Sequence, residues 1–308
     1  MGCTMGRRAS THTGLAWSAG WPVFSALRRG PRRVCTRPAS ALPCRTRCAA
    51  HRLDIRATAA MGAASAPTDG DEHASVPHDS EAVSVRDVSK TFRTADGPAV
   101  DALRDVSLTV QRGEVLGVLG AAASGKTTLA RCLCGSLTPD AGHILIMGRD
   151  TLQEPRWART HIGAVLQEAS VDKLLTGREH LELLGNLHDL PARKRRHAIE
   201  RAVELLEMQA SVDRPTGSYS DGHRRRLDMA LAILHEPPVL LLDEPMAGVD
   251  AETRRVIEKV LREMRRDGRS ILFTSQDVEE VHFLADRVLV LECGRVAATG
   301  ARRLTARP

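Results

Sequence analysis

The segment Gly120-Ala-Ala-Ala-Ser-Gly-Lys-Thr127 constrains this chain most, because it fits the phosphate-binding pattern G-x-x-x-x-G-K-[ST]. Backbone N–H groups must approach a phosphate closely there, which disfavours side chains at Gly120 and Gly125. Lys126 would bring positive charge to the β- and γ-phosphates of a nucleotide, and Thr127 a hydroxyl to Mg²⁺. The alternative is a Gly-rich turn between a strand and a helix, without a ligand. We predict a nucleotide site that also includes Ala121, Ala122, Ala123, Ser124 and Thr128.

The flanking residues predict where this loop lies in the fold. The apolar run 114–119 has the character of a buried strand, and residues 127–134 that of an opening helix. The positive end of that helix would point at the bound anion.

Positive charge is concentrated near the N-terminus. Residues 1–60 hold 11 Arg, no Lys and one acid, Asp54, a net charge of +10. The remainder holds 44 − 11 = 33 basic and 38 − 1 = 37 acidic residues, a net charge of −4. The overall charge of +6 is therefore no reason to expect nucleic acid as a partner of the folded part.

Composition predicts a disordered Arg-rich extension and linker over residues 1–80. Three interpretations stay open for residues 1–60: an upstream reading frame with the true start at Met61, an organelle transit peptide, or a basic tail that touches anionic surfaces. No paired C-x-x-C units occur, so we expect no zinc site, and we expect Cys132 and Cys134 to pack as small apolar residues. No apolar run reaches the ~18 residues of a membrane span.

From about residue 82, hydrophobic periodicity predicts strands alternating with helices. Alternation over 83–86 and 106–110 predicts antiparallel strands. Thr176 and Glu179 form a capping box for a helical stretch that breaks at Pro191 and continues to about Gln209. The pattern predicts one α/β domain over 81–308, a P-loop NTPase with a mixed sheet core, an antiparallel β subdomain and a helical subdomain at about 170–218. Further strands are predicted at 143–147, 162–166, 239–242, 270–274 and 287–291, and helices at 252–265 and 278–284.

A second group of functional residues follows the apolar run 239–242. Asp243 and Glu244 would lie at the carboxyl end of a parallel strand. Beside a phosphate loop, Asp243 can hold Mg²⁺ through water, and Glu244 can polarise an attacking water as a general base. A solvated strand end is the alternative when this segment is considered alone.

The order of these segments resembles the ATP-binding-cassette (ABC) ATPases, from about Val83 to Gly300. The Arg-Arg-Arg-Leu-Asp run at 224–228 resembles the daunorubicin-resistance type of ABC-2 drug-export cassette. The further matching segments are Phe92, Gln167 within 164–168, Tyr219–Ala230 at the place of the family signature, Ala247–Asp250, and Ser275–Glu280 at the place of the switch.

The resemblance implies a role for several residues. Phe92 would stack on adenine, and Gln167 would sense Mg²⁺ and couple to the membrane partner. Ser220 and Gly222 would belong to the signature, which faces the γ-phosphate of the ATP on a second chain. The switch residue, here Gln276, would contact the γ-phosphate and help to orient water.

The resemblance also implies partners and a location. Two cassettes, in a homo- or heterodimer, would close head-to-tail around two ATP molecules with Mg²⁺. Closure and hydrolysis would drive a separate transmembrane permease, while this chain itself spans no membrane. The expected location is the cytoplasmic face of a membrane, the plasma membrane in a bacterium or an organelle membrane if residues 1–60 are a transit peptide.

Several polar residues have a simpler interpretation. Arg224–Arg226 are expected to form a solvated helix face. His180 and His188, two turns apart, are expected at the surface. The basic run 193–196 is interpreted as a solvated face and not as a nucleic-acid patch.

Three residues depart from the family pattern. Ala123 stands where Gly is usual, at a position that often needs positive φ, which costs on the order of 1 kcal/mol. Asp221 stands in the signature where Gly is expected, so its carboxylate would repel the γ-phosphate. Gln276 replaces the switch His and can donate a hydrogen bond but cannot become cationic.

The sequence therefore favours the ATPase subunit of an export-type transporter, with turnover slowed by these departures. The alternative is a degenerate, non-hydrolytic nucleotide-binding module in which ATP only gates dimerisation or regulation. A cassette protein of translation or DNA repair is disfavoured, because neither a second cassette nor a long coiled-coil insertion is present.

Overall fold

A computed structural model describes residues 80–93, 98–167 and 171–301 of the protein. The predicted Arg-rich extension and linker fall on residues 1–80, of which all but Ser80 lie outside the described residues. The predictions for that segment therefore stay predictions.

Six strands form the main sheet, in the order β10-β9-β3-β8-β7-β6. The strands from β9 to β6 run parallel, and β10 pairs antiparallel with β9, which confirms the predicted mixed sheet. Strands β3, β7 and β8 are buried along their whole length, as expected where both faces of a sheet are covered. The bounds are β3 Val115–Leu119, β6 Ile162–Val165, β7 Val239–Asp243, β8 Ser270–Ser275, β9 Arg287–Glu292 and β10 Arg295–Ala301.

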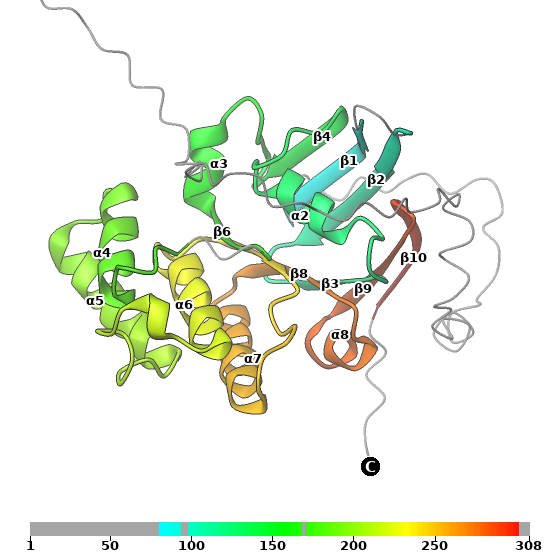
Figure 1. The fold of residues 1–308 in the computed structure, drawn as a ribbon. Coiled ribbons are helices and arrows are strands. Elements are labelled where there is room, and N and C mark those ends of the chain that lie inside the picture. The colour runs from blue at the N-terminus through cyan, green and yellow to red at the C-terminus, as the bar shows by residue number, and fades with distance from the viewer. Residues whose placement is uncertain (1–79, 94–97, 168–170, 302–308) are drawn as a thin grey trace, which may run out of the picture. The chain divides into compact units, whose positions relative to one another are not determined.

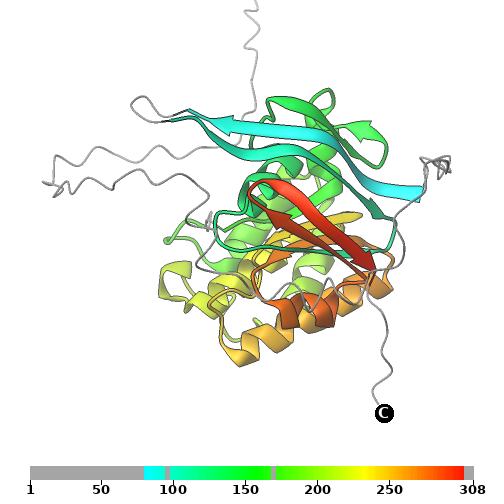
Figure 2. The same cartoon turned by 90° about the vertical axis from the view of Figure 1, so that its right-hand side faces the viewer.

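A second sheet, antiparallel throughout, lies over one face of the main sheet (Figures 1 and 2). Its order is β2-β1-β4-β5. Val85 pairs with Leu108, so the antiparallel strands predicted at 83–86 and 106–110 are confirmed. The bounds are β1 Glu81–Phe92, β2 Val100–Gln111, β4 Ala141–Ile146 and β5 Arg149–Asp150.

Helices α6, α7 and α8 lie on the opposite face of the main sheet (Figure 1). Helix α2 follows β3, and α4 and α5 form the helical insertion between β6 and β7. The bounds are α2 Lys126–Leu133, α3 Pro155–His161, α4 Gly177–Leu187, α5 Ala192–Leu205, α6 Asp221–Ile233, α7 Ala251–Arg266 and α8 Val278–Leu284, with a short 3-10 helix at Thr216–Ser218.

Alternate residues of the parallel strands point to opposite faces and divide the core into two clusters. Leu116 and Val118 join the cluster between the two sheets, together with Cys132 of α2. Val115 and Leu119 join the cluster formed with the helices. Cys132 is buried, as predicted for a small apolar residue, and burial raises the pKa of its thiol to about 12.

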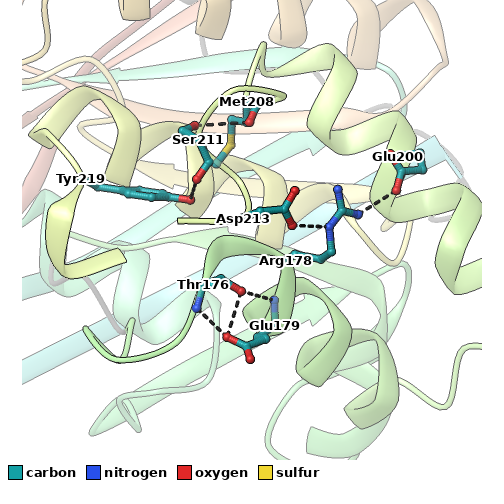
Figure 3. Close-up of polar contacts among 8 residues, drawn as sticks. All are labelled: Thr176, Arg178, Glu179, Glu200, Met208, Ser211, Asp213 and Tyr219. Atoms are coloured by element: carbon teal, nitrogen blue, oxygen red, sulfur yellow. Dashed lines mark hydrogen bonds and ion pairs between the residues drawn. The ribbon is translucent and has the colours of Figure 1, made fainter. Parts of the chain in front are cut away.

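The helical insertion is held together by polar contacts around the start of α4 (Figure 3). The predicted capping box is confirmed: Glu179 N donates to Thr176 Oγ1 at 3.1 Å, and Thr176 N donates to Glu179 Oε2 at 2.7 Å. Arg178 donates from Nε to Asp213 at 2.6 Å and from a terminal nitrogen to Glu200 at 2.7 Å. Arg178 thereby joins α4 to α5 and to the segment that follows α5.

The prediction of surface positions for His180 and His188 was wrong. His180 is buried, with Nε2 accepting from Asp172 N at 2.9 Å and Nδ1 donating to Thr176 O at 2.8 Å. His188 is half-buried, and its ring stacks on His235 with 3.9 Å between the ring centroids. The loops that precede α4 and follow α6 cover these histidines, which helical spacing alone could not indicate.

Helix α3, the two-residue strand β5 and strand β10 were not predicted. Helix α3 is only seven residues long and begins with Pro155, a residue suited to the first turn of a helix. Strand β10 is exposed at nearly every position, so its sequence lacks the hydrophobic alternation that marks a strand.

Candidate active site

The phosphate-binding loop joins β3 to α2, and backbone contacts exclude side chains at its two glycines. A Cβ at Gly120 would lie 2.5 Å from Ser124 Oγ and 2.6 Å from Leu291 O. A Cβ at Gly125 would lie 2.5 Å from Ala102 O, and the φ of +108° at Gly125 also favours glycine. Both positions therefore need glycine even before a ligand is considered.

Ala123 has the left-handed backbone that the sequence predicted, with φ of +61°. A Cβ in this conformation approaches the following carbonyl oxygen and costs about 1–2 kcal/mol. The loop therefore carries strain at this residue that a glycine would not have.

Lys126 opens α2, and its side chain is only 4% exposed. Its Nζ donates to Gly120 O at 2.8 Å and to Ala121 O at 2.9 Å, and lies 3.3 Å from Glu244 Oε1. The carboxylate of Glu244 is 12% exposed, so the desolvation of both charges offsets much of their attraction. Phosphate oxygens entering the loop would compete with these oxygens for the ammonium group.

Asp243, the last residue of β7, is fully buried. Thr274 Oγ1 on the neighbouring strand β8 donates to Asp243 Oδ1 at 2.6 Å. Asp243 Oδ2 and Ser124 Oγ are buried atoms without a hydrogen-bond partner among the described residues. Because such atoms are costly, they fit a ligand that offers a cation and anionic oxygens, as Mg·ATP does.

Glu244 has a left-handed backbone with φ of +49°. Its N–H donates to Thr274 Oγ1 at 3.0 Å, and its Oε1 accepts from Gln276 Nε2 at 2.8 Å. The ammonium of Lys126 lies beside the same oxygen. The candidate base, the loop lysine and the switch residue therefore meet at one carboxylate oxygen.

Two predicted site residues lie at the ends of strands. Phe92 ends β1, is 43% exposed and pairs with Val100 of β2. Two residues further along β2, Ala102 packs against the phosphate loop, which places Phe92 at the end of the sheet that borders the loop. Gln167 follows β6, the strand beside β7, and is exposed, with no side-chain hydrogen bond to any described residue.

The predicted signature opens α6 and is anchored to the helical insertion. Ser220 Oγ accepts from His223 N at 3.2 Å and caps the helix. The buried Tyr219 donates its hydroxyl to Ser211 O at 2.7 Å, and Ser211 Oγ donates to Met208 O at 3.3 Å (Figure 3). The hydrogen bond of Tyr219 to the segment after α5 thus fixes the position of the adjacent Ser220.

The charged residues of the signature differ in exposure. The Asp221 side chain is 86% exposed and accepts from Arg224 at 3.2 Å. Arg226 is 4% exposed, so the prediction of a solvated face over 224–226 was wrong for this residue. Its guanidinium points toward α7 and away from solvent.

Comparison with known proteins decides the family. The family model described as ABC transporter matches residues 103–247. The ABC transporter ATP-binding protein NatA of Bacillus subtilis (strain 168) is 33% identical over 220 residues, which cover 71% of this chain and 89% of NatA. The chain belongs to the ATP-binding-cassette family.

Two further comparisons describe this cassette more closely. The daunorubicin resistance ATP-binding protein DrrA3 of Streptomyces coeruleorubidus is 42% identical over 208 residues, 68% of this chain and 65% of DrrA3. The matched segment therefore spans just under two thirds of that relative. The dimeric structure of an ATP-binding cassette in a post-hydrolysis state, bound to ADP and Pi, is 25% identical, with a TM-score of 0.67 over 72% of this chain and 99% of that chain. The predicted P-loop fold is confirmed.

None of the helices in the described ranges of this cassette combines the length and the apolar character that crossing a bilayer requires.

Two residues of β8 hold the site of this cassette together: Thr274, which the sequence analysis did not identify, and Ser275, which it placed in the switch segment without a role. Thr274 lies beside Asp243 in the register of β7 and β8, so a correct pairing of these strands would have found it. Ser275 accepts from Gly120 N through its carbonyl at 3.2 Å and donates from Oγ to Glu280 at 2.9 Å. Burial raises the pKa of Glu280, which favours its protonated form.

The turn between β9 and β10 was also missed. Gly294 N donates to Ser124 O at 2.9 Å, and Gly294 O accepts from Arg104 N at 2.7 Å. This turn therefore braces the phosphate loop of the cassette against β2, a long-range contact that no local pattern encodes.

Proposed function

We propose that this chain binds and hydrolyses Mg·ATP and drives export through a separate transmembrane subunit at the cytoplasmic face of a membrane. The observation that supports this most is the meeting of Lys126 and Gln276 at the carboxylate of Glu244, beside the phosphate loop. The name of the relative DrrA3 supports the drug-export type.

In this proposal, the loop N–H groups and Lys126 hold the phosphates, and Phe92 stacks on adenine. Thr127, Gln167 and Asp243 would hold Mg²⁺, which neutralises phosphate charge when bound. Asp243 is suited to this role because one of its two oxygens is buried and lacks a partner among the described residues.

Glu244 is proposed as the general base. Phosphates draw Lys126 toward themselves, because they carry more negative charge than the loop carbonyls that hold it. Glu244 then keeps the contact with Gln276, which orients its carboxylate toward an attacking water. Since the Gln276 amide is neutral at every working pH, this orientation does not depend on protonation of the switch residue.

A second ATPase chain completes each site in this proposal. Ser220 and Gly222 of one chain approach the γ-phosphate bound by the other, and the dimeric state of the solved relative supports such closure. The exposed carboxylate of Asp221 lies next to this approach and opposes it, which slows turnover.

The test is steady-state ATP hydrolysis by the purified full chain. Hydrolysis that Glu244→Gln abolishes is the expected result. A double repair, Asp221→Gly with Gln276→His, is expected to raise the rate. A wild-type chain that binds Mg·ATP yet shows no hydrolysis at any protein concentration, with the repaired chain active, would refute hydrolysis by this chain alone.

A further inference from the structure

Arg226 carries a full charge but lies inside the protein, between α6 and α7. Its Nε donates to Thr253 Oγ1 at 3.3 Å, and a terminal nitrogen donates to Glu252 at 2.9 Å. Glu252 is 78% exposed, whereas Thr253 is 1% exposed. An ion pair with an exposed carboxylate contributes little, so the contact that is specific to this site is the buried one with Thr253.

Thr253 links Arg226 to the N-cap of α7. Its Oγ1 accepts from Arg226 and donates to Asp250 Oδ2 at 3.1 Å, while its N–H donates to Asp250 Oδ1 at 2.8 Å. Asp250 is the N-cap of α7. These hydrogen bonds from Thr253 lower the pKa of Asp250, and the charge of Arg226 acts in the same direction.

Gly222 brings the first turn of α6 against the same two residues. A Cβ at Gly222 would lie 2.5 Å from Thr253 Oγ1 and 2.6 Å from Asp250 Oδ2. Gly222 and Arg226 are four residues apart and therefore share one face of α6. The start of α6 thus meets the start of α7 through a close backbone contact and, one turn later, through a guanidinium.

We infer that Arg226 is a positioning residue that fixes the first turn of α6, and with it Ser220 and Gly222, against the cap of α7. The inference rests on the proposed function, in which Ser220 and Gly222 approach the phosphate of a nucleotide bound by a second chain. Arg226 touches neither the nucleotide nor the reacting atoms, and acts by fixing the direction in which the signature points.

Stability alone does not require a guanidinium here. Methionine can occupy much of the volume of the Arg226 stem, and removing the guanidinium leaves no buried charge without a partner, because the Glu252 carboxylate is 78% exposed. Directional donation to Thr253 is what methionine cannot supply. A positioning role therefore predicts a variant that folds, binds ATP with its own loop, and hydrolyses it poorly.

The experiment uses the full chain with Arg226→Met, Arg226→Lys and Thr253→Val. Arg255→Met is the control, because it removes the same charge from an exposed position of α7, outside the signature. Hydrogen exchange of residues 221–226, Mg·ATP affinity by calorimetry at low protein concentration, and steady-state hydrolysis are measured on each variant.

Arg226→Met is expected to exchange at least ten-fold faster over 221–226 and to lose at least ten-fold in kcat, while the Kd for Mg·ATP changes less than two-fold. Thr253→Val should show the same pattern, Arg226→Lys a smaller effect, and the control Arg255→Met wild-type values.

Two results would overturn the inference. One is wild-type exchange over 221–226 in Arg226→Met. The other is faster exchange throughout the chain together with weaker ATP binding, as simple destabilisation would give. If the wild-type chain itself does not hydrolyse ATP, the proposed function fails, and exchange over 221–226 still decides whether Arg226 fixes this turn.

Discussion

Acidification should destabilise this protein through a histidine at the junction of the helical insertion and the main sheet. His235 follows α6, stacks on His188, and contacts Ile162 O through Nε2 at 3.2 Å. Its Nδ1 is buried without a hydrogen-bond partner among the described residues. Burial lowers the pKa of His235 to about 4, and the neighbouring His188, Arg269 and His161 act in the same direction.

The sign and size of the effect follow from the two pKa values. The unfolded chain binds this proton below about pH 6.5, and the folded chain only below about pH 4. Between these values the unfolded state holds more protons, so the free energy of unfolding falls as the pH falls. For His235 the loss is about 2 kcal/mol between pH 8 and pH 5, and about 3.4 kcal/mol in full. Burial also lowers the pKa of His188, which adds to the loss.

Urea unfolding at pH 8 and at pH 5 measures the effect. His235→Gln is the test variant, because its amide can still donate to Ile162 O but does not titrate. Its loss of stability between the two pH values should be about 2 kcal/mol smaller than in the wild type. His197→Gln, on the exposed face of α5, is the control and should match the wild type. Equal pH dependence in His235→Gln and the wild type would show that His235 is not the source of the acid destabilisation.

Three further predictions follow from buried groups. Thr274→Val removes the donor to the buried carboxylate of Asp243 and should lower the free energy of unfolding by about 1–3 kcal/mol in chemical denaturation without nucleotide. Cys132, with a thiol pKa of about 12, should resist iodoacetamide at pH 8 until denaturant is added, whereas peptide mapping should find the exposed Cys293 alkylated; early labelling of Cys132 would contradict its burial. Tyr219→Phe removes a buried hydroxyl donor and should cost about 1 kcal/mol in thermal unfolding, and an unchanged Tm would count against the anchoring of the signature.

Sequence reasoning succeeded where the chemistry is local. The phosphate loop, the capping box of Thr176 and the apolar strand before Asp243 each depend on a few adjacent residues. Each of these patterns follows directly from one physical requirement: a close backbone approach, a hydrogen-bonded N–H group, or a strand covered on both faces. They predicted the fold class and the segments that form one side of the site.

Long-range contacts could not be predicted from the sequence. Thr274 enters the site because β8 lies beside β7, and Gly294 because a turn more than 160 residues away folds onto the phosphate loop. Arg226 follows two other arginines and shares their polarity, so only the position of α7 shows that its side chain is buried. Periodicity reports which face of a helix is apolar, but not which polar residue finds a buried partner.

The two polar departures from the family pattern act in physically different ways. The Gln276 amide already donates to Glu244, so its hydrogen bond is made within the chain's own site. Replacing the switch histidine by Gln276 therefore affects only the activation of the attacking water. Asp221 is exposed and, among the residues that the structure describes, forms an ion pair with Arg224 alone, so its charge acts on whatever approaches the start of α6. Since Arg226 fixes that start against α7, the signature has little freedom to turn the carboxylate of Asp221 away from an incoming phosphate. Under the proposed function, Asp221 should therefore limit closure of two chains around ATP, while Gln276 limits the hydrolysis that follows closure.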